Sequence, residues 1–140
     1  MTTASTPSSS ATLPDTLCYL NGEYSPLQDA KISVLDRGFI FGDGVYEVLP
    51  AYGGRIFRFD QHMARLDRSL DALRINNPHS PAEWLAMARR LIDALVASTG
   101  APNQIVYIQI TRGVAPRDHV MPRGLRPTVF MMVSEMKQAT

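Results

Sequence analysis

The chain has 140 residues and a formal net charge of +1, with 14 Lys and Arg against 13 Asp and Glu. Its length is typical of one domain, and the balanced charge argues against a nucleic acid or another polyanion bound by bulk electrostatics. Without a run of about 18 apolar residues the sequence predicts no membrane-spanning helix. Its one cysteine, Cys18, excludes an internal disulfide and favours a reducing compartment, for which we expect the cytoplasm.

The N-terminal part predicts a tail followed by a hairpin. Residues 1–15 are mainly Ser, Thr, Ala and Pro without periodicity, which is typical of a flexible tail. Residues 16–20 and 23–25 predict two short strands. Asn21-Gly22 between them favours the positive φ angles of a tight hairpin turn.

Further extended segments follow along the chain. Residues 30–34 alternate apolar and polar side chains, which predicts an extended stretch with one buried face. Residues 45–52 predict a strand in which Pro50 indicates an edge or a bulge, because proline lacks a backbone donor. Gly53-Gly54 predicts a second hairpin turn that leads into residues 55–57.

Two amphipathic helices come next. Asp60 is expected to cap the first helix, and the capping box Ser80-Pro81-Ala82-Glu83 begins the second, which stops at Gly100. Each helix has one apolar face, formed in the first by Met63, Leu66, Leu70 and Leu73 and in the second by Trp84, Ala88, Leu91 and Leu95.

The last elements complete the predicted fold. Residues 104–111 and 128–134 predict strands, and residues 112–127 between them form a long loop rich in Gly, Pro and Arg. The order of strands, two helices and strands predicts an α+β fold. We expect a two-layer sandwich in which an antiparallel sheet carries two helices on one face.

The first segment with possible chemistry is residues 36–47, Asp-Arg-Gly-Phe-Ile-Phe-Gly-Asp-Gly-Val-Tyr-Glu. Its three glycines permit tight turns and a close approach to a ligand. The spacing does not match the dinucleotide-binding or P-loop fingerprints. By itself, the segment is most simply interpreted as a glycine-rich connection that enters a strand.

The second segment is residues 111–119, Thr-Arg-Gly-Val-Ala-Pro-Arg-Asp-His. Arg117 offers a planar fork that binds carboxylates or phosphates, and His119 adds a second donor for the same anion. The alternative is a solvated basic loop without a ligand. We expect no metal site, because the histidines His62, His79 and His119 lie far apart in the sequence, without Cys or carboxylate at ligand spacing.

Three single residues are ambiguous at this level. Arg65 flanks the apolar face of the first helix and is more typical of a surface residue than of a phosphate ligand. Tyr46 lies on a predicted strand and either packs in the sheet or faces a ligand. Cys18 is more typical of a small buried residue than of a nucleophile.

Together, the two segments carry a family resemblance. Residues 36–48 resemble the N-terminal signature of the class IV pyridoxal-phosphate aminotransferases, which continues through Gly53-Gly54 and the His-x-x-Arg-Leu element at residues 62–66. Residues 111–119 are similar to the D-amino-acid aminotransferase branch of that class. The resemblance extends from residue 17 to residue 134 and implies the small N-terminal domain of that fold.

The resemblance implies roles for four side chains. Arg65 would bind the phosphate of pyridoxal 5'-phosphate, Tyr46 would face the substrate pocket, and Arg117 and His119 would bind the substrate α-carboxylate. The implied reaction transfers an amino group from an amino acid, in this branch a D-amino acid such as D-alanine, to a 2-oxo acid. In the family the loop with Arg117 and His119 enters the neighbouring subunit's site. This implies a homodimer, with neither nucleic acid nor membrane as a partner.

The sequence also departs from the family. Only two of its basic residues are lysines, Lys31 and Lys137, and neither matches the family's Schiff-base lysine. We therefore expect an inactive fragment, with residues 16–134 as the small domain and residues 135–140 beginning an interdomain linker. The alternatives are an aminodeoxychorismate lyase or branched-chain aminotransferase of the same class, and a stand-alone binding or dimerisation domain without catalysis.

Overall fold

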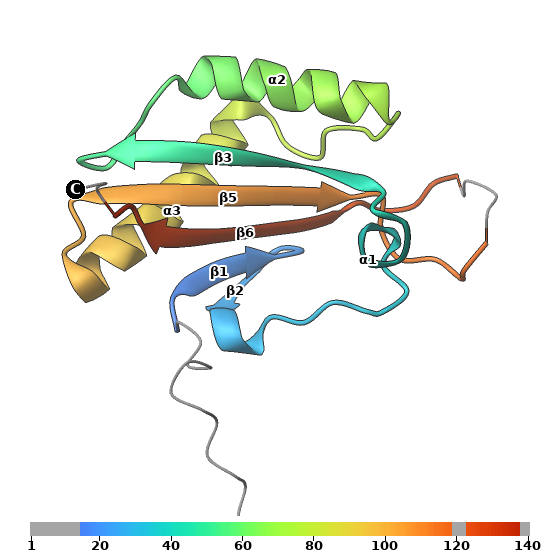
Figure 1. Cartoon of the computed structure of the whole chain (residues 1–140), viewed down its shortest axis with the longest axis horizontal. Helices are drawn as coiled ribbons and strands as arrows, with labels where there is room; N and C mark the ends of the chain where they lie inside the picture. Colours follow the sequence, from blue (N-terminus) through green and yellow to red (C-terminus); the bar gives the residue numbers. More distant parts are fainter. Residues whose placement is uncertain (1–14, 119–122, 138–140) are drawn as a thin grey trace, which may run out of the picture.

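The computed structural model describes residues 15–118 and 123–137, and its centre is a six-stranded sheet with the strand order β2-β1-β6-β5-β3-β4 (Figure 1). Every neighbouring pair of strands is antiparallel. The strands are β1 Leu17–Leu20, β2 Glu23–Pro26, β3 Gly44–Tyr52, β4 Arg55–Ile56, β5 Asn103–Thr111 and β6 Thr128–Glu135. The helices are α1 Arg37–Phe41, α2 Phe59–Ala72 and α3 Pro81–Thr99, and a 3₁₀ turn covers Leu27–Asp29. This architecture confirms the predicted α+β fold.

The hydrophobic core lies between one face of the sheet and the two long helices, α2 and α3. Alternate residues of each central strand point into it, as a half-covered sheet requires. The expected apolar faces of both helices are buried, except that Leu73 is only partly buried because it follows the last turn of α2. Cys18 is also buried, as predicted.

The predicted turns and caps are largely confirmed. Asn21 and Gly22 have φ angles of 50° and 96°. The Ser80 side chain accepts from the Glu83 amide at 3.2 Å, and the Glu83 carboxylate accepts from the Ser80 amide at 2.8 Å. The prediction for Asp60 was wrong, because the N-cap of α2 is Arg58, two residues earlier and in a left-handed conformation. Asp60 therefore lies in the first turn, where its charge still suits the helix N-terminus.

The sheet explains the position of Pro50. Its carbonyl accepts from the Phe57 amide on the side of β3 that faces β4. Because the N–H and C=O of one strand residue point to the same side, the missing donor also faces β4. That strand pairs with β3 only at Ala51 and Tyr52, so Pro50 lies where β3 is almost an edge, as predicted.

The segment before the glycine-rich motif differs from the prediction. Residues 30–34 form no strand, because no ladder partner lies beside them in the described part of the chain, and Ile32 and Val34 are exposed. The expected connection after them contains a short helix, α1. Its N-cap is Asp36, whose carboxylate accepts from the Gly38 amide at 2.8 Å. Among the residues that the structure describes, no helix combines the length and apolarity needed to span a membrane.

Gly44, in the first motif, lies close against the backbone of β5. A Cβ at this position would lie 2.6 Å from the carbonyl oxygen of Ile110 and 3.0 Å from the Cα of Thr111. Since both neighbours are backbone atoms, we expect Gly44→Ala to lower the free energy of unfolding by about 1–3 kcal/mol, as overpacked sites do. Urea denaturation measures this change, with Ser134→Ala at an exposed position of β6 as a control, and equal stability of the two variants would contradict it.

Candidate functional site

The first cluster of polar side chains joins β3 to α2. The carboxylate of Glu47 is 3% exposed and accepts from Nη2 of Arg65 at 2.6 Å and from Nε at 3.1 Å and 3.2 Å. His62 lies 2.7 Å from the same carboxylate through Nδ1. Because an ionised carboxylate only accepts, His62 donates from Nδ1. The cluster is a buried acid held by two side chains of one helix.

Local periodicity explains why these groups meet. In β3, Glu47 alternates with Tyr46 and so points toward the helices. On α2, His62 and Arg65 are three residues apart and therefore share a face. Burial alone would raise the pKa of Glu47, but the hydrogen bonds and charges of Arg65 and His62 outweigh it and hold that pKa below its ordinary value. The acid therefore remains ionised at neutral pH.

Arg65 is fixed at one end and open at the other. Its side chain is 58% exposed, and its Nη1 has no hydrogen-bond partner among the described residues. The pKa of Arg65 is raised, mainly by its hydrogen bonds to Glu47 and the charge of that carboxylate, and to a smaller extent by Tyr46. A guanidinium that keeps free donors and a fixed direction is suited to bind an anion.

Tyr46 lies on the opposite face of the sheet, which the two long helices leave open and which α1 contacts only at the end near Thr111. Its side chain is 64% exposed and stacks on Tyr107 of β5, with ring centroids 5.8 Å apart. Phe130 of β6 continues the row, 6.5 Å from Tyr107. The Tyr107 hydroxyl donates to the side-chain oxygen of Gln109 at 3.2 Å, and burial raises its pKa. An aromatic row therefore crosses three strands on the open face.

Arg117 lies apart from these residues. It is exposed in the loop after β5 and makes no hydrogen bond or ion pair with Tyr46 or Arg65 in the described part of the chain. His119 lies outside the described residues. The structure thus places Tyr46 on β3 and bonds Arg65 to the neighbouring Glu47, and it leaves Arg117 in the loop that follows β5.

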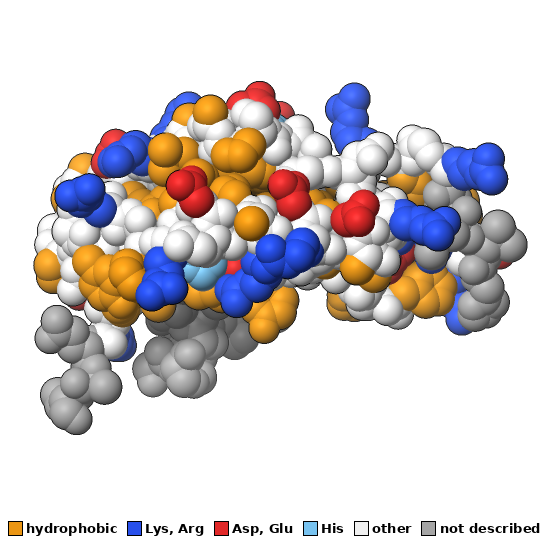
Figure 2. Space-filling view, turned by 90° about the horizontal axis from the view of Figure 1, so that it is seen from above, with side chains coloured by type: hydrophobic (Ala, Val, Ile, Leu, Met, Phe, Trp, Pro, Cys, Tyr) orange, Lys and Arg blue, Asp and Glu red, His pale blue; other side chains and the backbone are white. Residues whose placement is uncertain are grey.

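Glu47 and His62 lie within the sequence motifs, but the sequence alone gave them no role. The available signal was the position of Glu47 among apolar residues in a predicted strand. A carboxylate buried at such a position needs a cationic partner, so the pattern indicates a charged cluster. No group of three or more His, Cys, Asp or Glu side chains in the described ranges is arranged to hold a metal ion. Figure 2 shows basic side chains spread along the α2 side of the molecule with acidic ones between them.

The Glu47 cluster gives a testable dependence on pH. A carboxyl whose pKa is lowered by folding stabilises the fold above its ordinary value of about 4.3, and this contribution is lost as the pH falls through the lower folded pKa. We expect Glu47→Gln to lose about 1–2 kcal/mol at pH 7, since Arg65 and His62 lose a charged acceptor. The free energy of unfolding of the Glu47→Gln variant should also fall less steeply than that of the wild type as the pH is lowered. Urea denaturation from about pH 3 to 7 measures the loss at pH 7 and the slope in acid, and Glu135→Gln serves as control. Parallel pH curves for Glu47→Gln and the wild type would contradict this assignment.

Comparisons with known proteins agree with the motifs. The family model for Amino-transferase class IV matches residues 44–140. D-alanine aminotransferase of Staphylococcus aureus (strain N315) is 40% identical over 104 residues, which cover 74% of this chain and 36% of the relative. D-alanine aminotransferase of Bacillus licheniformis is 38% identical over 109 residues, covering 78% of this chain and 37% of the relative. The chain thus spans little more than a third of the length of these relatives.

Solved structures share the fold. Branched-chain amino acid aminotransferase from Escherichia coli has a TM-score of 0.75 at 21% identity, covering 87% of this chain and 41% of that one. Branched-chain aminotransferase from Thermoproteus uzoniensis has a TM-score of 0.71 at 22% identity, covering 88% of this chain and 41% of that one. With the family model covering most of the described residues, this chain belongs to the class IV aminotransferases.

Proposed function

We propose that this chain is the N-terminal domain of a D-amino-acid aminotransferase that uses pyridoxal 5'-phosphate. Residues 16–134 would form the small domain, after a tail over residues 1–15, and residues 135–140 would begin the linker to a second domain. The proposal is supported by the D-alanine aminotransferases at 40% identity and by the motif at residues 111–119. The substrates would be an amino acid such as D-alanine and a 2-oxo acid, and the buried free thiol of Cys18 suits the cytoplasm.

The observation that carries this proposal is the geometry of Arg65. Two of its nitrogens are held by Glu47, while Nη1 and much of the side chain face solvent. This arrangement fits the phosphate of pyridoxal 5'-phosphate, because a phosphate dianion needs fixed cationic donors. When bound, the cofactor supplies the electron sink for amino-group transfer. The Glu47–His62 pair would keep the Arg65 donors aimed at the phosphate.

The other predicted residues would act on the substrate. Tyr46 would line the substrate pocket from the open face of the sheet, with Tyr107 behind it. Arg117, together with His119, would bind the α-carboxylate and so fix which face of Cα is presented for proton transfer. The loop that contains them would do this in the neighbouring subunit, which makes the working unit a homodimer.

The role of Arg65 can be measured on the 140-residue chain. We expect pyridoxine 5'-phosphate to shift the amide NMR signals around Glu47 and Arg65, and Arg65→Leu to weaken this binding at least about tenfold, the loss of one charge-assisted contact. Pyridoxine 5'-phosphate is used because it lacks the aldehyde that reacts with amines.

Two comparisons make that titration specific. Arg68→Leu removes another exposed arginine of α2 and is expected to leave the binding unchanged. Pyridoxine without the phosphate is expected to bind more weakly by a similar factor. Equal binding by the Arg65→Leu variant, or equal binding of pyridoxine, would show that Arg65 does not bind the phosphate.

The chain alone is expected to have no transaminase activity. The Lys31 ammonium donates a hydrogen bond to the carbonyl of Gln28 at 3.5 Å, and Lys137 follows the last strand. Within the described ranges, neither lysine makes a hydrogen bond to Arg65 or Tyr46. We expect no pyruvate from D-alanine and 2-oxoglutarate in the presence of pyridoxal 5'-phosphate. Intact mass must show only the 15.5 kDa chain, and turnover proportional to that species would refute the expectation.

A further inference from the structure

A second cluster of charged side chains lies where β5 ends and α1 begins. Asp43 accepts from Nε of Arg112 at 2.6 Å, from Nη2 of Arg112 at 3.2 Å and from Nε of Arg37 at 3.1 Å. The side chains of all three residues are no more than 11% exposed. Burial alone would raise the pKa of Asp43, but the hydrogen bonds and charges of Arg112 and Arg37 hold it below its ordinary value. Two buried guanidinium groups thus share one ionised carboxylate.

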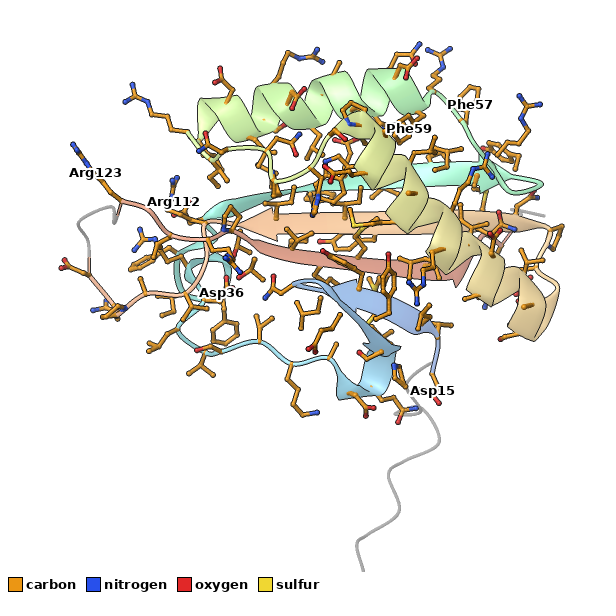
Figure 3. All side chains as sticks on the ribbon, turned by 180° about the vertical axis from the view of Figure 1, so that it is seen from behind. Asp15, Asp36, Phe57, Phe59, Arg112 and Arg123 are labelled. Carbon is orange, nitrogen blue, oxygen red and sulfur yellow. The ribbon has the colours of Figure 1, made fainter. Side chains whose placement is uncertain are left out.

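The arginines of this cluster also donate in two other directions. Nη2 of Arg112 donates to the carbonyl of Leu73 at 2.6 Å, at the end of α2. Nη1 of Arg37 donates to the carbonyl of Asp118 at 3.1 Å, in the loop after β5. The cluster therefore connects the end of α2, the first motif and the loop that contains Arg117. Figure 3 shows Arg112 and Asp36 close to this junction.

Backbone contacts hold the same loop against the first motif. The Arg37 amide donates to the carbonyl of Gly113 at 2.8 Å, and the Ala115 amide donates to the carbonyl of Leu35 at 3.4 Å. Asp36 and Val114 form an isolated antiparallel bridge between the two segments. Residues 113–115 are thus paired with residues 35–37, while residues 116–118 lie beyond the pairing.

Asp36 secures the other end of the loop. Its carboxylate is fully buried and accepts from the Thr128 hydroxyl at 2.6 Å, where β6 begins. Gly113 has a φ of 115°, and a Cβ there would collide with the carbonyl of Arg126. Both ends of the loop are therefore fixed to the segment at residues 36–43.

We propose that Arg37, Asp43 and Arg112 form a clasp that sets the path of residues 113–118, and that Arg37 is a positioning residue for Arg117. Arg117 makes no hydrogen bond or ion pair of its own in the described ranges, so its backbone is placed by its neighbours. The next residue, Asp118, is bonded through its carbonyl to Arg37. The consequence for substrate binding rests on the proposed function of Arg117, whereas the clasp itself does not.

Amide hydrogen exchange on the 140-residue chain tests the clasp without cofactor or substrate. Arg37→Lys keeps the positive charge beside Asp43 but not the fork that also reaches Asp118. We expect the Ala115 amide to exchange at least about tenfold faster, while the Ile108 amide in the middle of β5 changes by less than about threefold, as for local opening. Arg37→Met removes the charge as well, and should accelerate exchange at both amides.

The controls separate positioning from general stability. Arg68→Lys, on the exposed face of α2, is expected to change neither amide. If Arg37→Lys accelerates Ala115 and Ile108 in parallel, or leaves Ala115 unchanged, Arg37 does not position the loop. Failure of the pyridoxine 5'-phosphate titration would refute the cofactor role of Arg65 and leave this result intact, so the two proposals fail separately.

A measurement on the wild type covers the case in which Arg37→Lys does not fold. We expect the Nη1 protons of Arg37 to exchange at least about tenfold more slowly than those of the exposed Arg68, because they are buried and bonded to the Asp118 carbonyl. Equal exchange at the two side chains would overturn the clasp.

Discussion

The site depends on one constraint, which is that Glu47 is buried and ionised beneath α2. A buried carboxylate is tolerated only with cationic partners and hydrogen bonds, and Arg65 and His62 provide both. This requirement fixes the rotation of α2 relative to β3. It also fixes the direction of the exposed end of Arg65, because a guanidinium bound through two nitrogens cannot swing freely. The anion-binding capacity of the surface thus follows from a charge in the interior.

The same arrangement occurs a second time in the chain. Asp43 is the shared acid there, and Arg37 and Arg112 are its two cationic partners, all of them buried. In both clusters an acid from the segment at residues 36–47 orients at least one arginine from a later element. The planar fork of arginine bonds the acid and still has a donor for a carbonyl or a ligand, which a lysine ammonium cannot do with the same geometry. This explains physically why arginine is used at these positions.

Much of the fold was predictable because it depends on local patterns. The capping box at Ser80 and the turn at Asn21-Gly22 are short-range signals, and the structure contains both. The strand expected at residues 30–34 was wrong because alternation predicts a strand only where a partner exists. The roles of Tyr46, Arg65 and Arg117 came from a family resemblance and remain predictions. Glu47 and Asp43 were not assigned, since their partners Arg65 and Arg112 lie 18 and 69 residues further along the chain and only the folded sheet brings them together.

The shortness of β4 has a consequence for how copies of this chain meet. β4 pairs with β3 only at Ala51 and Tyr52, so the stretch of β3 around Glu47 has no strand on that side within the described residues. An open strand edge invites pairing with a strand of another molecule, and charged side chains beside it oppose such pairing. Arg65 and His62 are bonded to β3 along this stretch. The helix α2, which lies along this side of β3 in Figure 1, and the charge of Arg65 therefore both oppose edge-to-edge pairing at this stretch.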